Sequence, residues 1–133
     1  MKSDDLGKLI LRLVLGILIL LHGLFKVTHG VGGVASMLTQ HNLPGFLAYF
    51  VFVGEVLAPV LLIMGIYTRM GGLLIAGNMM VAFFLAHQGG MASLNAAGGW
   101  ALELQGMFLF GALAVFFMGA GRFSLAGSGG RWN

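Results

Sequence analysis

The sequence of 133 residues contains no cysteine and few charges. Without cysteine the chain forms no disulfide, offers no thiolate to a metal and has no thiol redox chemistry of its own. Any redox role therefore requires a bound cofactor or a partner chain. Charged residues make up 8% of the chain, against about 25% in an ordinary soluble domain, which leaves too little polar surface for a soluble fold. The seven basic residues are scattered rather than clustered, so nucleic acid is not an expected partner.

Hydrophobic residues are abundant instead, at 59% of the chain. They gather in four stretches, residues 6–25, 46–67, 70–86 and 100–118. Each is close to the ~20 residues that cross the ~30 Å hydrocarbon core of a bilayer. Backbone groups in lipid must be hydrogen-bonded within their own segment, so each stretch is predicted to be a helix. The sequence thus predicts an all-α, polytopic membrane protein with a four-transmembrane-helix bundle over residues 1–126 and a flexible cytoplasmic tail over 127–133.

The first stretch and the basic residues predict how the chain sits in the membrane. Residues 6–25 are longer than the ~7–15 apolar residues of a signal peptide, and Lys26 follows them without a small-residue cleavage site. We therefore expect a retained helix. Every basic residue except Lys26 lies toward one side of the bundle: near the N-terminus, in the turn between the second and third helices, or after the fourth helix. By the positive-inside rule both termini are expected in the cytoplasm, with Arg12, Arg69 and Arg122 as topology anchors. Arg12, two turns into its helix, is expected to reach backbone carbonyls or a lipid phosphate.

The spacing of residues also suggests an internal repeat. Arg12 is followed 20 and 21 residues later by the glycine pair 32–33, and Arg69 at the same distances by the pair 89–90. Each half then holds one glutamate in its second helix, Glu55 or Glu103. Such halves would be related by an axis along the membrane normal. Apolar helices also resemble one another by chance, so the sequence alone leaves the repeat open.

Ionisable residues within or at the ends of the spans are the candidate functional residues. They are His22, Lys26, Glu55, His87 and Glu103. An ionisable side chain in a span costs about 2.5–3.5 kcal/mol on insertion scales, so it needs a partner or a role. The directions of the four helices bring all five residues to the outer half of the bundle, away from the termini. We also expect Asn78, in mid-span, to form a hydrogen bond between helices.

Two interpretations of these residues stay open. In the first, they line an outward-facing polar pocket for a quinone head group or a similar small molecule, with Glu55 and Glu103 handling protons. In the second, Lys26 pairs with Glu55 or Glu103 purely to lock helices together, in a non-enzymatic scaffold or assembly factor. A transporter is less favoured, because four helices form only a small pathway. Whether the protein is an enzyme, for example a quinone-linked subunit of a membrane oxidoreductase, stays open as well.

Metal and haem sites are not expected. Neither HxxxH nor ExxH spacing occurs, and a haem held between His22 and His87 is disfavoured because lone histidines at a membrane interface are usually just interfacial. The expected partners are the lipid bilayer and a membrane or periplasmic protein. The sequence does not decide the oligomeric state, a homo-oligomer included.

The chain resembles the DoxX family of small four-helix membrane proteins over residues 9–126. The matching segments are RLVLG at 12–16, HGLFK at 22–26, GE at 54–55, LIMGIYTR at 62–69, AH at 86–87, EL at 103–104 and GAGRFSL at 119–125. Relatives commonly carry proline where this chain has Ala120. The resemblance implies a bacterial inner-membrane protein, and relatives include a small subunit of an archaeal thiosulfate:quinone oxidoreductase. The quinone in the first interpretation is partly what this resemblance implies, and function transfers within a family less well than fold.

Overall fold

The computed structural model describes residues 2–86, 94, 97–99, 102–127 and 130–133, and these are mainly helical. The elements in chain order are α1 (Lys2–His29), α2 (Gly32–Gln40), the 3₁₀ helix η1 (Gly45–Phe50), the π-helical turn η2 (Val53–Leu57), α3 (Ala58–Met64), α4 (Thr68–Ala86) and α5 (Glu103–Met118). Because η1, η2 and α3 follow one another almost without interruption, they act as one rod. Four rods therefore match the four predicted spans, and the all-α prediction is confirmed.

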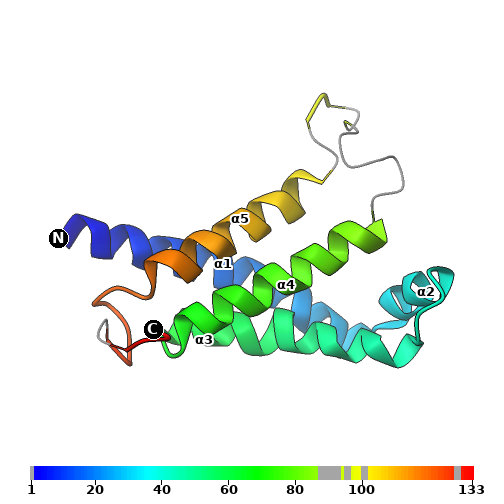
Figure 1. The fold of residues 1–133 in the computed structure, drawn as a ribbon, viewed down its shortest axis with the longest axis horizontal. Coiled ribbons are helices and arrows are strands. Elements are labelled where there is room, and N and C mark those ends of the chain that lie inside the picture. The colour runs from blue at the N-terminus through cyan, green and yellow to red at the C-terminus, as the bar shows by residue number, and fades with distance from the viewer. Residues whose placement is uncertain (1, 87–93, 95–96, 100–101, 128–129) are drawn as a thin grey trace.

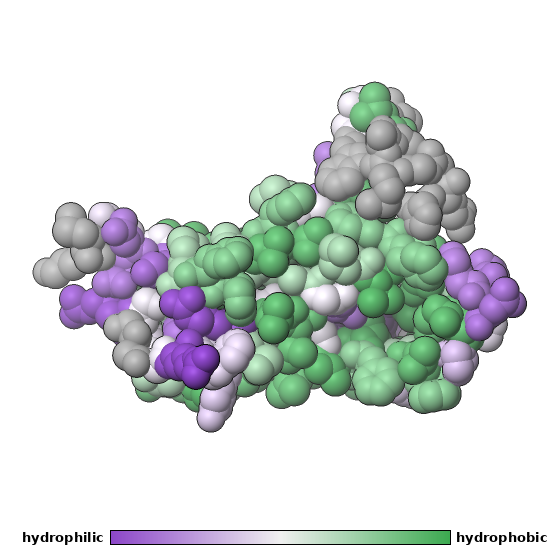
Figure 2. Space-filling view, in the orientation of Figure 1, coloured by the Kyte–Doolittle hydropathy of each residue, from purple (hydrophilic) through white to green (hydrophobic). Residues whose placement is uncertain are grey.

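The lengths and surface of the rods are those of a membrane protein. Three helical segments, Ser3–His29, Gly45–Met64 and Thr68–Leu85, are long and apolar enough to cross a membrane. The fourth, α5, has 16 residues and extends over roughly 24 Å at 1.5 Å per residue. On the face shown in Figure 2, apolar side chains cover most of the middle of the molecule, while hydrophilic side chains gather toward its two ends. An apolar middle of this kind suits the hydrocarbon core of a bilayer.

The rods pack as an antiparallel bundle. Both termini lie at one end of the bundle, and α2 lies at the other (Figure 1). α4 packs between α5 and the η2–α3 part of the second rod, and α1 packs on α3, η2 and α5. Ile19, Leu62 and Ile75 meet Val115 in the shared core, and each is at most 1% exposed. The bundle positions one end of α1, the middle of the second rod and α4 around a common region.

Arg12 reaches backbone carbonyls, which is one of the two kinds of acceptor expected for it; the other was a lipid phosphate. Its side chain is 1% exposed. Nε donates to the carbonyl oxygen of Leu62 at 2.9 Å, and Nη1 donates to those of Ala120 and Phe123 at 2.8 and 2.9 Å. The last carbonyls of a helix lack partners within that helix, and Leu62 lies in the last turn of α3. Arg12 therefore caps α3 and ties it to the turn that follows α5.

Arg69 performs the same task for α5. Its Nη1 donates to the carbonyl oxygens of Phe116 and Phe117 at 2.8 and 2.9 Å, which lie in the last turn of α5. A glycine with a positive φ follows each capped helix: Gly65 has φ 74° and Gly119 has φ 79°. A Cβ added at Gly65 would lie 2.9 Å from Nη2 of Arg12, and one at Gly119 would lie 2.9 Å from Nη2 of Arg69.

These matched caps support the internal repeat that the spacing suggested. In each half, an arginine near the start of the first helix caps the carboxyl end of the second helix. A glycine lies beside each cap, at a position where a Cβ would not fit. Arg122 differs from both, because its side chain is exposed and its guanidinium lies 5.3 Å from the ring of Phe123. Its role as a topology anchor, like that of the other two arginines, stays a prediction.

The end of the chain returns to the bundle. The flexible tail over 127–133 stays a prediction. Asn133 is 6% exposed, and its Oδ1 accepts a hydrogen bond from the backbone N–H of Thr68 at 3.0 Å. The N–H of Arg69 donates to the carbonyl oxygen of Trp132 at 2.8 Å. The first N–H groups of a helix lack partners within it, and asparagine is a favourable cap. The described end of the tail therefore caps α4.

Candidate functional site

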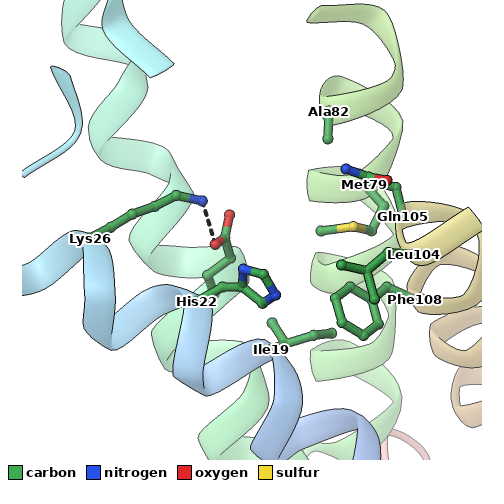
Figure 3. A pocket seen from close by; sticks show the side chains of 9 residues that line it. Ile19, His22, Lys26, Met79, Ala82, Leu104, Gln105 and Phe108 are labelled. Carbon is green, nitrogen blue, oxygen red and sulfur yellow. Dashed lines mark hydrogen bonds and ion pairs between the residues drawn. The ribbon is translucent and has the colours of Figure 1, made fainter. Parts of the chain in front are cut away.

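The carboxylate of Glu55 joins three rods in the bundle interior. Glu55 is 5% exposed. Its Oε1 accepts a hydrogen bond from Nζ of Lys26 at 2.6 Å, and its Oε2 accepts one from Nδ2 of Asn78 at 3.0 Å. Lys26 lies near the end of α1, Glu55 in η2 and Asn78 in the middle of α4. The ion pair that Lys26 forms is the dashed contact in Figure 3. A buried charge needs a partner of this kind, because lipid and protein interior do not solvate it.

Local sequence brings the three rods close together around Glu55. A Cβ added at Gly23 would lie 2.0 Å from the carbonyl oxygen of Glu55, and one added at Gly54 would lie 2.5 Å from Cβ of Asn78. Small residues at such crossings let helix backbones approach. Glu55 also sits in the middle of the π-helical turn Val53–Leu57, and π turns within helices occur frequently at functional sites. Together these features hold the carboxylate in a fixed place.

A cavity of ≈110 Å³ opens beside the ion pair. Its polar lining consists of His22 and Lys26 from α1, Glu55 from η2 and Gln105 from α5, and its apolar lining includes Met79 and Phe108 (Figure 3). The ring of His22 meets that of Phe108 edge-on, with 5.8 Å between ring centroids and 78° between ring planes. The cavity thus combines hydrogen-bond donors and acceptors with an aromatic wall.

A second cavity of ≈190 Å³ adjoins the first. Lys26, Glu55, Ala82 and Gln105 line both cavities. The remaining lining of the second cavity is apolar and comes from α2, the second rod and α4: Val34, Met37, Val51, Val81 and Leu85. The ion pair therefore stands between two small spaces rather than closing one. The Lys26 side chain is 25% exposed and that of Glu55 is 6% exposed, so Lys26 is the more accessible partner.

The structure brings together three of the five predicted site residues. His22, Lys26 and Glu55 line the first cavity, as expected. Among the described residues that line either cavity, Glu103 is not found, and its side chain is exposed. Residues on an α-helix turn by roughly 100° each, and Gln105 of α5 faces the cavity, so Glu103 two residues earlier points away. The predicted convergence of Glu103 with Glu55 is therefore not present.

Three further residues bear on the site: one predicted to line it, one predicted to join helices and one that the sequence analysis did not single out. His87 lies outside the described residues. Asn78 forms the helix-to-helix hydrogen bond expected of it, and its partner is the candidate carboxylate itself. Gln105 was missed, because an uncharged side chain near a helix end carries no hydropathy signal of its own. In the described part of the chain, no group of three or more His, Asp or Glu side chains is arranged to hold a metal ion.

Comparison with known proteins connects this geometry to a family. Residues 7–88 match the model of the family described as DoxX. Over 75 residues the chain is 37% identical to a protein of Bacillus subtilis (strain 168) named "Putative oxidoreductase CatD". That segment is 56% of this chain and 55% of the relative, so the chain spans about half the length of the relative it matches. No solved structure matches the chain. The residues that match the family contain Lys26, Glu55 and Asn78 but not α5.

Proposed function

Since the chain belongs to the DoxX family, we propose that it is a bacterial inner-membrane protein whose outward-facing cavity binds the head group of a quinone. The observation that carries the proposal is the buried Glu55 carboxylate, bonded to Lys26 and bordered on both sides by space. The similar protein from Bacillus subtilis has a name that refers to oxidoreductase activity, and this agrees with a redox-linked ligand.

The residues around the cavity fit a quinone ring. A quinone has two carbonyl oxygens that accept hydrogen bonds, and Lys26 carries three N–H donors, of which Glu55 engages one. His22 and Gln105 line the same cavity and offer further donors. The apolar side chains of Met79 and Phe108 suit the faces of a flat ring. The long Lys26 side chain stands between the two cavities, so its movement would join them around a ligand.

In this role a bound quinone supplies the electron-accepting chemistry, and the chain manages protons and orientation. Lys26 would donate a hydrogen bond to a carbonyl oxygen of the ring. Glu55 would take up or release a proton at Oε1 or Oε2, because a carboxylate within reach of a bound ring is a general acid–base group. The chain has no cysteine, so electrons would come from a partner protein in or beside the membrane.

The proposed orientation follows from the basic residues. Lys2, Lys8, Arg12, Arg69, Arg122 and Arg131 belong to the end that holds both termini. By the positive-inside rule that end faces the cytoplasm. Lys26 and Glu55 then lie in the periplasmic half of the bundle, where protons would exchange with the outer side. A membrane or periplasmic oxidoreductase would be the fitting partner.

A scaffold role is the second candidate, and one observation favours it. Lys26 and Glu55 are in direct contact at 2.6 Å, and Asn78 satisfies the other carboxylate oxygen, as expected of a purely structural lock. In that case the site would bind no quinone and the cavities would be packing defects. The two candidates therefore differ in ligand binding, not in stability.

Titration of purified protein with menadione, a quinone without a tail, tests the proposal. We expect saturable binding to the wild type and a loss on the order of tenfold for Glu55→Gln, which corresponds to about 1.4 kcal/mol. Glu103→Gln is the matched control, because it makes the same change at an exposed position outside both cavities. Absence of binding to the wild type, or equal binding by Glu55→Gln, would contradict the quinone site and favour the scaffold.

A further inference from the structure

An apolar groove of ≈460 Å³ lies between α2, η1 and α4. Every residue that lines it is apolar, among them Leu38 of α2, Leu47 of η1 and Met80 and Phe84 of α4. The groove is larger than either polar cavity, which have volumes of ≈110 and ≈190 Å³. Pockets that enclose a drug-sized ligand have volumes from about 300 Å³ upward. The polar cavities are therefore large enough for only part of such a ligand.

The apolar groove adjoins the second polar cavity and shares a wall with it. Val34, Val51, Val81 and Leu85 line the groove and also line the second cavity. That second cavity is in turn lined by Lys26 and Glu55. The shared aliphatic side chains therefore form the wall between the cavity at the ion pair and the groove beneath α2. The space on one side of this wall has a charged, hydrogen-bonding lining, and the space on the other side is entirely apolar.

Volume and apolar lining alone do not single out this groove. A groove of similar size, ≈440 Å³, lies between α1 and the second rod and is lined by Val27, Phe52, Val53, Val56, Leu57 and Val60. Of the residues that the structure describes, none lines both this second groove and a polar cavity. The wall shared with the cavity of Lys26 and Glu55 distinguishes the groove beneath α2, and the other groove serves as the comparison.

We propose that the groove beneath α2 holds the apolar tail of the ligand whose head group lies at Lys26 and Glu55. This inference rests on the proposed function and narrows it, because it makes the ligand a quinone with a prenyl tail rather than a water-soluble quinone. The two neighbouring spaces suit the two parts of such a molecule, with donors and a carboxylate for the ring and aliphatic side chains for the tail. The tail would pass between them where the shared aliphatic side chains turn aside. In lipid no hydrophobic effect drives the tail into the groove, so the tail contributes affinity through packing against these side chains.

Paired quinones and paired variants test this inference. Binding of menadione is compared with binding of a menaquinone analogue that has the same ring and a tail of two isoprene units, in the same detergent. We expect the tailed analogue to bind the wild type on the order of tenfold more tightly. Leu47→Trp, which fills the groove beneath α2, should remove most of that gain and leave menadione binding within about twofold. Val60→Trp introduces the same bulky side chain in the other groove, outside the π turn that holds Glu55, and should alter neither.

The outcomes separate failure of the inference from failure of the proposed function. Equal affinity of the two quinones for the wild type, or equal loss in Leu47→Trp and Val60→Trp, would overturn the tail site and leave the groove to annular lipid, with the head-group site intact. If neither quinone binds the wild type, both proposals fail. If Leu47→Trp does not fold, the wild type is labelled instead with a tailed analogue that carries a photoreactive group at the end of its tail. The position of the label then tests the inference. Labelling of residues 43–51 and 80–85 supports the inference, and labelling centred on 52–60 overturns it.

Discussion

Nζ of Lys26 lies 2.6 Å from Oε1 of Glu55, and this contact joins the end of α1 to the π turn in the middle of the second rod. The pair is unequal, because 25% of the Lys26 side chain is exposed and only 6% of that of Glu55. The Glu55 carboxylate therefore relies on its partner for charge compensation more than the Lys26 ammonium does, because water reaches the ammonium more easily. Removing one partner of a buried pair strands the other charge, which costs more than the pair itself contributes.

Lys26→Met should destabilise the protein more than the double variant Lys26→Met/Glu55→Gln. The single variant leaves the Glu55 charge unpaired, and about 3 kcal/mol is expected from the lower end of the range for broken buried pairs. The double variant removes both charges and should recover part of that loss. Denaturation in mixed micelles, followed by the fluorescence of the two tryptophans, measures both. Equal stability of the single and double variants would mean that the pair is not buried as described.

Arg12→Lys should be nearly as damaging as Arg12→Met. Arg12 donates to carbonyl groups of α3 and of the segment after α5 at the same time, and the compact ammonium of lysine does not reproduce this fork. Loss of several charge-assisted hydrogen bonds should cost at least about 3 kcal/mol. Arg122→Lys is the control, since Arg122 is exposed. A wild-type thermal midpoint for Arg12→Lys in detergent would contradict the capping role.

Gly23→Ala should separate α1 from η2. The new Cβ would lie 2.0 Å from the carbonyl oxygen of Glu55, so the backbones must move apart and the Lys26–Glu55 contact must lengthen. We expect a loss of both stability and menadione affinity. Gly77→Ala on α4 is the matched control, because nothing lies within 4 Å of its added Cβ, and alanine favours helix over glycine by about 1 kcal/mol. Identical behaviour of the two variants would contradict the close crossing at Gly23.

The orientation in the membrane has a direct test, because the chain has no cysteine of its own. Single cysteines placed at Ser3 and at Ser36 report the two ends of the bundle, and both positions are exposed. A membrane-impermeant maleimide added to intact spheroplasts should label Ser36→Cys and not Ser3→Cys. Lysis should make both reactive, which controls for access. The reverse pattern in intact spheroplasts would place the site in the cytoplasmic half.

The fold and part of the site follow from sequence for a clear physical reason. Hydropathy and span length predict the number of helices and the depth of each residue, and depth was enough to bring Lys26 and Glu55 together. Hydropathy does not predict rotation about a helix axis, which is why Glu103 was expected in the cavity that Gln105 lines. Nor does it reveal the π turn at Val53–Leu57, because that turn depends on contacts between rods rather than on local propensity.

The contacts of Arg12 show a second limit. Its carbonyl partner at Ala120 is 108 residues away in the chain, and backbone carbonyls have no signature in sequence. The position of Arg12 two turns into its helix predicted backbone carbonyls or a lipid phosphate as acceptors, but the identity of the acceptors depends on where α3 and α5 end. The described end of the tail is similar, since the cap that Asn133 provides to Thr68 requires the finished bundle.

Mass spectrometry of small molecules extracted from gently purified protein tests the quinone site most directly. Wild type and Glu103→Gln should each release a quinone, and Glu55→Gln, purified in the same detergent and in equal amount, should release far less. Glu55 borders both polar cavities and Glu103 borders neither, so the depletion should occur in Glu55→Gln and not in Glu103→Gln. A wild type that releases no more quinone than an unrelated membrane protein, or a Glu55→Gln variant that releases as much as the wild type, would contradict the account.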